Sequence, residues 1–225
     1  MRTLPFPTPA AALAVACVAG AVLLAPAPVL GQADELSRPD GWEVRFDRPG
    51  MGEGDMEMFV AMPPGWHITT GPSGIFWDPD LTAEGDFRIE AEIYLFDPEG
   101  RRESFGIFFG GRDLAGDAQA YTYFLIRDGG QYIVKERNGA DAPTLVAWTD
   151  HDAVVSWADR EEGGANVLNT LAVESRAGTL HFFVNDVEVT SVPAGDMPVD
   201  GVVGLRVNHR LNLHVSRLEV MPLGG

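Results

Sequence analysis

Residues 121–137 read YTYFLIRDGGQYIVKER, two runs rich in aromatic and β-branched residues on either side of Asp128-Gly129-Gly130. Such runs favour strands, and Asp and Gly tolerate the positive φ angles of a tight connection. The stretch therefore predicts an antiparallel β-hairpin. If the connection is three residues long, Arg127 faces Gln131, and every other cross-strand pair follows from that register. A two-residue connection would shift the register and change which residues face each other.

The three-residue register sorts the side chains of this hairpin onto two faces, because successive strand residues point to opposite sides. One face combines tyrosines with cations, and it holds Tyr121, Tyr123, Arg127, Gln131, Lys135 and Arg137. The other face is suited to a core, and it holds Thr122, Phe124, Ile126, Tyr132 and Val134, with Glu136 as the misfit. Lys135 is the only lysine in the chain.

The rest of the chain after residue 40 follows the same strand pattern. Apolar residues alternate with polar ones over 87–94, 180–185 and 211–215, which is typical of half-buried strands. Turn residues such as Asn185-Asp186 separate these runs. No stretch of comparable length has a helical period, and residues 153–159 are expected to form at most one short helical turn. About a dozen strands with hairpin signals predict an all-β, antiparallel two-sheet sandwich or barrel.

The N-terminal segment is expected to be a cleaved signal peptide, residues 1–33. Arg2 is followed by an unbroken apolar run from Ala10 to Ala25, and small residues at Gly31 and Ala33 fit the spacing that a signal peptidase reads. We therefore expect a secreted or periplasmic protein with one domain, residues 34–225, and no membrane span after cleavage. An uncleaved anchor and a lipoprotein modified at Cys17 are the alternatives.

Charge and cysteine content narrow the classes of partner and chemistry. Cys17 is the only cysteine, so the mature chain would have no disulfide, zinc-thiolate site or cysteine nucleophile. The full chain has a formal net charge of −17, which is expected to repel nucleic acid and anionic membranes. Neutral glycans and calcium remain compatible with this charge, and the acidity also suits the solubility of an exported protein.

Four further segments carry a resemblance to a known superfamily. They are residues 86–93 (DFRIEAEI), 104–110 (SFGIFFG), 169–189 (ending in TLHFFVNDVEV) and 201–207 (GVVGLRV). Together they resemble the strands of concanavalin A-like lectin/glucanase domains, in particular laminin-G-like and keto-disaccharide-hydrolase-like domains. The resemblance implies a jelly-roll sandwich with its ligand on the concave sheet. It also implies that Arg206, Asn208, Asn212 and His214 join the tyrosine face of the hairpin.

Members of this superfamily include lectins, glucanases and lyases, so the fold does not fix the activity. Its glucanases carry catalytic carboxylates on one strand, and the nearest candidates here are Glu90 and Glu92. They lack a third acid, because Tyr94 occupies the next position on that face. His151, in a polar loop, is the remaining catalytic candidate. The alternative is that Glu90 and Glu92 form a solvated face or pair with the hairpin cations.

No cofactor is expected except a structural calcium ion, which many members bind. Carboxylate oxygens are its preferred ligands, and the candidates are Asp78, Asp80, Asp113 and Asp117. Trp66 and Trp77 are expected in the core. Trp148 and Trp157 flank the loop from 149 to 164, the expected lid, and we prefer one of them as a residue that stacks on the ligand.

Aromatic rings suit the C–H faces of sugars, and arginine suits their hydroxyls. The leading hypothesis is therefore a non-catalytic carbohydrate-binding module with a glycan or polysaccharide as partner. Its candidate ligand-binding residues are Tyr121, Tyr123, Arg127, Lys135, Arg137, Trp148, Arg206, Asn208 and His214. The alternatives are a carbohydrate-active hydrolase or lyase, and a structural module whose tyrosine face is filled by its own ion pairs.

Overall fold

The computed structural model describes residues 38–224, which form fourteen strands and two short 3₁₀ turns. The predicted signal segment, residues 1–33, lies outside the described residues. The strands are β1 (Glu43–Phe46), β2 (Met58–Ala61), β3 (Trp66–Thr69), β4 (Gly74–Ala83), β5 (Phe87–Phe96), β6 (Ser104–Arg112), β7 (Ala120–Arg127), β8 (Gln131–Asn138), β9 (Thr144–Asp150), β10 (Asn166–Arg176), β11 (Thr179–Val184), β12 (Val187–Pro193), β13 (Gly201–Val207) and β14 (Asn212–Pro222). The turns are η1 (Glu53–Asp55) and η2 (Trp157–Asp159). No helix within 38–224 is long and apolar enough to cross a membrane.

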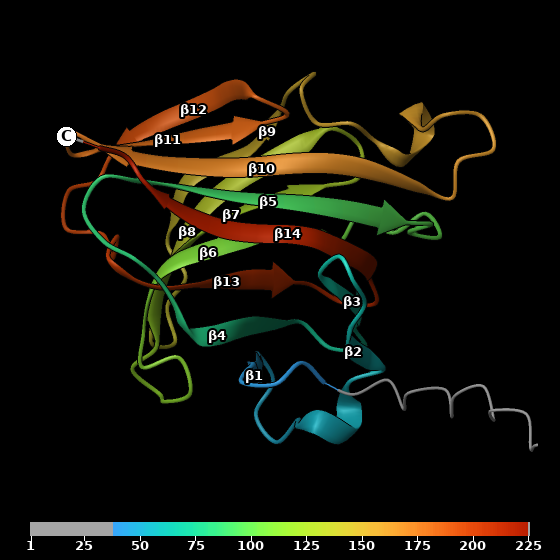
Figure 1. Cartoon of the computed structure of the whole chain (residues 1–225), viewed down its shortest axis with the longest axis horizontal. Coiled ribbons are helices and arrows are strands. Elements are labelled where there is room, and N and C mark those ends of the chain that lie inside the picture. The colour runs from blue at the N-terminus through green and yellow to red at the C-terminus, as the bar shows by residue number, and fades with distance from the viewer. Residues whose placement is uncertain (1–37, 225) are drawn as a thin grey trace, which may run out of the picture. The chain divides into compact units, whose positions relative to one another are not determined.

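The strands form two antiparallel sheets of seven strands each (Figure 1). Sheet A has the order β1-β4-β13-β6-β7-β8-β9, and sheet B has the order β12-β11-β10-β5-β14-β3-β2. Strands β6 to β9 follow one another as a meander in sheet A, and β10 to β12 do so in sheet B. Within the described residues the chain changes sheets seven times, among them between β5 and β6 and between β13 and β14. The predicted two-sheet antiparallel sandwich is confirmed.

The hairpin at residues 121–137 has the predicted register. Tyr121 pairs with Arg137, Tyr123 with Lys135, and Arg127 with Gln131. The connection is three residues long because Gly129 and Gly130 adopt φ angles of 89° and 78°, which glycine reaches without a Cβ clash.

The core lies between the sheets and receives the predicted inner face of the hairpin. Phe124, Ile126, Tyr132 and Val134 belong to the main buried cluster. The ring of Phe124 in β7 lies 5.2 Å from that of Phe182 in β11, so the two sheets pack directly on each other. Each fully buried side chain of this size contributes about 1.5–3 kcal/mol.

A second apolar cluster lies on the opposite face of sheet A, which we call the outer face of sheet A. It contains Ile75, Trp77, Phe108, Leu114, Tyr121, Tyr123, Leu125 and Ile133, all buried. The prediction that Trp77 is a core residue is confirmed, since it is 3% exposed, and the core that it joins is this second cluster. Trp66 is partly buried against the main core, with its ring 4.7 Å from Trp42.

Candidate functional site

The outer face of sheet A brings together most of the predicted ligand-binding residues. Tyr121 and Tyr123 lie on it in β7, directly opposite Arg137 and Lys135 in β8. Paired positions of this kind place Cβ atoms about 4.5–5.5 Å apart. The predicted grouping of tyrosines and cations on one face is therefore confirmed.

Arg206 of β13 reaches the same face and is fixed there by Asp47. Its Nη1 and Nη2 donate to the Asp47 carboxylate at 3.0 and 2.6 Å, and Nη1 also donates to the Tyr121 hydroxyl at 3.2 Å. The guanidinium lies 5.1 Å from the centre of the Tyr123 ring. Burial alone lowers the pKa of Arg206, but Tyr121 and Asp47 raise that pKa above its ordinary value. Arg206 is thus a permanent charge held in a bidentate ion pair.

The two tyrosines form the floor of this face, with ring centres 5.6 Å apart. Burial raises the pKa of both hydroxyls, while Arg206 opposes the rise. Tyr121 is only 1% exposed and Tyr123 is 6% exposed. Tyr121 therefore supports Arg206, and Tyr123 is the more accessible of the two rings.

Arg127 and Trp148 form a stacked pair at the β9 side of the face. The guanidinium carbon of Arg127 lies 3.9 Å from the centre of the Trp148 ring. Arg127 Nε donates to the Gln131 side-chain oxygen at 2.8 Å, and the Gln131 amide in turn donates to Asp150 at 2.8 Å. Burial and repulsion from Arg102 lower the pKa of Arg127, while Asp150 opposes them. Trp148 is half-buried, so one part of its ring remains open.

Lys135 and Arg137 differ from these anchored arginines. No ion pair joins either residue to a carboxylate within 38–224, where pairs up to 4.0 Å are counted. The Nε atom of Arg137 is buried and has no hydrogen-bond partner among the described residues, and the same is true of Arg206 Nε. Asn208 also belongs to this face, because its amide donates to Ser104 Oγ at 2.7 Å and Ser104 pairs with Arg127.

The prediction that His214 lies on this face is wrong. The chain leaves sheet A after β13 and enters sheet B at β14, so alternation along β13 does not continue into β14. His214 pairs with His67 and Tyr94 on sheet B, as part of a cluster of rings 6.0–6.2 Å apart. Asn212 lies on β14 of sheet B as well.

The catalytic candidates Glu90 and Glu92 also lie on sheet B, on its outer face. Arg217 Nη2 donates to Glu90 at 2.5 Å and to Glu92 at 2.8 Å, and Arg88 Nη2 donates to Glu90 at 2.6 Å. The alternative that these acids pair with the hairpin cations is wrong, because those cations belong to the other sheet. Both carboxylates are therefore members of a network of ion pairs with Arg88 and Arg217.

His151 lies in the loop after β9. Its Nδ1 accepts the backbone N–H of Ala153 at 3.1 Å, and its ring lies 6.2 Å from Tyr132. The loop is held to the sandwich, because the Asn169 side chain donates to and accepts from the Val155 backbone, both at 2.9 Å. His151 therefore belongs to a loop that is docked on the sandwich. The loop from 149 to 164, which we expected to act as a lid, is attached to the sandwich at Val155.

The acidic calcium candidates do not converge. Asp78 and Asp80 lie on β4, where Asp78 accepts the Asp80 backbone N–H at 3.0 Å. Asp113 accepts the Ala118 backbone N–H at 3.0 Å and closes the loop after β6. No group of three or more His, Cys, Asp or Glu side chains within 38–224 is placed to hold a metal ion. The calcium site stays a prediction.

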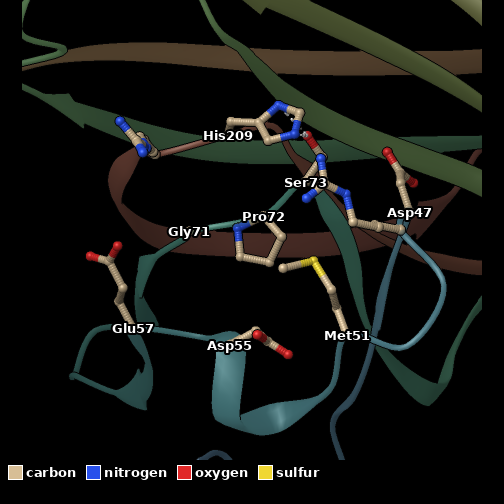
Figure 2. Close-up of a pocket in the computed structure, with 10 residues that line it drawn as sticks. Asp47, Met51, Asp55, Glu57, Gly71, Pro72, Ser73 and His209 are labelled. Carbon is tan, nitrogen blue, oxygen red and sulfur yellow. Dashed lines mark hydrogen bonds between the residues drawn. The ribbon is translucent and has the colours of Figure 1, made fainter.

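A cavity of about 690 Å³ opens beside the outer face of sheet A (Figure 2). Asp47 lines it and so links it to Arg206, and Ser73, whose backbone oxygen accepts the Asp47 N–H at 2.9 Å, lies beside it together with His209. Ser73 Oγ lies 2.9 Å from His209 Nδ1 and 3.4 Å from Nε2, and Glu103 approaches Nδ1 at 3.7 Å. A catalytic triad needs the acid and the hydroxyl on different ring nitrogens, whereas here the shorter Ser73 contact and the Glu103 contact both fall on Nδ1.

Asp47, Ser73 and His209 were not predicted from the sequence. Asp47 lies 159 positions from Arg206, to which it binds, and no local sequence pattern predicts a pair so far apart. Ser73 and His209 are likewise 136 positions apart. Only the pairing of β4 with β13 in sheet A brings these segments together.

No protein-family model and no curated sequence matches the chain. Solved structures do match it. The carbohydrate-binding module CBM66 from Bacillus subtilis gives a TM-score of 0.58 at 12% identity, over 83% of this chain and 97% of that one. A GH16 protein of the Bacteroides ovatus mixed-linkage glucan PUL gives 0.57 at 10% identity, over 83% and 97%. The carbohydrate recognition domain of Emp46p gives 0.53 at 12% identity, over 82% and 89%.

Identities this low show the fold alone. All three solved structures match over at least 82% of this chain, which corresponds to the whole two-sheet sandwich rather than to one motif. The chain therefore has a concanavalin A-like two-sheet fold.

Proposed function

We propose that this protein binds a carbohydrate on the outer face of sheet A and does so without catalysing a reaction on it. The observation that carries the proposal is the half-buried Trp148 ring, which is stacked on Arg127 at 3.9 Å. Tyr123, Lys135 and Arg137 lie on the same face. An aromatic ring beside fixed planar donors suits a sugar, whose C–H face stacks and whose hydroxyls accept hydrogen bonds.

Two features support binding rather than catalysis. The acids Glu90 and Glu92 are held by arginines on the other sheet, and the shorter Ser73–His209 contact uses the same ring nitrogen, Nδ1, that Glu103 approaches. Two of the matching solved structures carry carbohydrate-binding names, whereas another is a GH16 protein. The proposal includes export from the cytoplasm, as the predicted signal segment implies.

Removal of the Trp148 ring tests the proposal. Binding of the full chain to a glycan array should identify ligands, and titration calorimetry should then compare the wild type with Trp148→Ala. An aromatic contact contributes about 0.5–1.5 kcal/mol, so the dissociation constant should rise about two- to tenfold.

Phe183→Ala is the matched control. Phe183 also lies under an arginine, with the Arg88 guanidinium 5.4 Å from its ring centre, but it belongs to sheet B. This variant should keep the wild-type affinity. Equal losses in the two variants, or no binder on an array that includes acidic and neutral glycans, would contradict the proposal. Release of reducing sugar by the wild type would favour a hydrolase instead.

A further inference from the structure

The outer face of sheet A carries a surplus of positive charge in an otherwise acidic protein. The chain has a net charge of −17, yet β7, β8 and β13 present Arg127, Lys135, Arg137 and Arg206 around the two tyrosines. Asp47 neutralises Arg206 through an ion pair. Within residues 38–224, Arg127, Lys135 and Arg137 have no ion pair with a carboxylate.

The state of Arg137 points to a missing acceptor. Its Nε is buried without a hydrogen-bond partner among the described residues, which is unfavourable because the group has left water without replacing the bond. It lies opposite Tyr121 in the pair of strands, so an acceptor above the tyrosine floor could reach the guanidinium edge. Arg206 and, on sheet B, Arg217 have the same unpartnered Nε, but both are held by carboxylates, whereas no ion pair within 38–224 holds the Arg137 guanidinium.

Lys135 lies next to Arg137 on the same face of β8, two residues along the strand. That spacing separates the two backbone positions by about 6.6 Å, so both side chains can contact one oxoanion. Guanidinium and ammonium groups bind carboxylate and sulfate oxygens by charge-assisted hydrogen bonds, which are stronger than those to neutral hydroxyls. A neutral sugar would leave both charges unpaired in the bound state.

We propose that the ligand of this face is an acidic saccharide, with a carboxylate or sulfate group bound by Lys135 and Arg137. This inference rests on the proposed function and specifies its ligand class. Trp148 and Tyr123 contact the sugar ring, while Arg206 is fixed by Asp47 and helps to set the positive potential of the face.

The test compares saccharides that differ only in charge. Polygalacturonate is paired with its methyl ester, and dextran sulfate is paired with dextran, so that the two pairs distinguish carboxylate from sulfate. Binding of the full chain is measured by calorimetry at low and at about 0.3 M salt. In at least one pair the charged member should bind about tenfold tighter or better, and the preference should shrink at high salt.

The variants locate the effect. Lys135→Gln/Arg137→Gln should reduce binding of the charged member about tenfold or more. Arg101→Gln/Arg176→Gln removes the same amount of charge elsewhere, since Arg101 pairs with Glu99 and Arg176 with Glu174, and it should bind like the wild type. If the double variant fails to fold, Lys135→Gln alone gives the same comparison, because the Lys135 side chain has no hydrogen bond within the described residues.

Each outcome bears on a separate claim. Tight binding of neutral glycans with no preference for the charged member overturns the acidic ligand and leaves carbohydrate binding standing. An acid preference that survives in Lys135→Gln/Arg137→Gln overturns the assignment of these two residues. Failure of every glycan, charged or neutral, overturns the proposed function itself.

Discussion

Among single residues, Arg206 does most to organise the outer face of sheet A. It joins β13 to the loop after β1 through Asp47, and it holds the hydroxyl of Tyr121. A buried cation is stable only when a counter-charge accompanies it. The position of this arginine therefore depends on a carboxylate from a distant part of the chain.

Removal of that carboxylate is expected to destabilise the protein strongly. Asp47→Ala leaves the Arg206 side chain, which is 10% exposed, with an uncompensated charge. We expect the free energy of unfolding to fall by about 3 kcal/mol. This value is at the low end of the range for buried ion pairs because the Asp47 side chain is 37% exposed. Urea unfolding followed by circular dichroism measures it.

The double variant Asp47→Ala/Arg206→Met removes both charges and should be more stable than Asp47→Ala alone. The difference isolates the coupling between the two residues. Additive losses in the double variant would mean that the ion pair contributes nothing beyond the separate side chains.

His67 makes the stability of the fold depend on pH. Burial lowers its pKa, a contact with Asn212 opposes this, and the facing His214 lowers it further. The folded protein thus binds this proton less readily than the unfolded chain does. The contribution to stability is complete above the ordinary pKa of 6.5 and is lost as the pH falls through 6.5 toward the lowered folded value.

The free energy of unfolding should therefore decrease between pH 7.5 and 5.5, and less steeply in His67→Gln than in the wild type. Urea titrations at pH 7.5, 6.5 and 5.5 measure both slopes. His209→Gln is the control, because His209 is 59% exposed and lies at the other sheet. Identical slopes in the wild type and His67→Gln would contradict the prediction.

At the scale of elements, the β11–β12 hairpin shows how a turn can do more than reverse the chain. Asn185 and Asp186 both adopt positive φ, 49° and 65°, as the two-residue connection requires. The Asn185 side chain donates to Ala153 and Asn169 at 2.8 and 3.0 Å and accepts from Thr170 at 2.8 Å. The turn therefore also holds the loop after β9.

Glycine substitutions separate the two roles of this turn. Asp186→Gly relieves the left-handed backbone and removes an 89% exposed side chain, so stability should rise by up to about 1 kcal/mol. Asn185→Gly relieves the same backbone but loses the network, so stability should fall by about 1–3 kcal/mol. Thermal or urea unfolding distinguishes them, and equal effects would mean that the network is dispensable.

Elements with a clear period were predictable from the sequence, and their partners were not. The hairpin at 121–137 followed from alternation and from the residues of its turn, because both signals are local. His214 was misplaced because the superfamily resemblance put both closing strands on the tyrosine face, whereas the chain changes sheets between β13 and β14. Glu90 and Glu92 were placed on a strand face, but Arg217, the arginine that they share, is 125 or more positions away.

At the scale of the whole molecule, the two-sheet sandwich was predictable because many short strands with turn residues admit few other architectures. The buried second cluster on the outer face of sheet A was not predicted. Alternation along one strand shows which residues share a face. It does not show that Trp77 of β4 and Tyr121 of β7 belong to one cluster, because only the assembled sheet brings these strands together. The candidate site was thus half predictable, with its β7–β8 part local and its Asp47–Arg206 part non-local.

The contrast between the outer faces of the two sheets has a consequence for how a ligand approaches. Sheet B balances its arginines against glutamates, whereas sheet A keeps unpaired cations in a chain of net charge −17. The surface outside this patch is therefore more negative than the chain average. A polyanion is repelled from most directions and attracted from one, so the molecule orients itself during encounter, before any hydrogen bond forms.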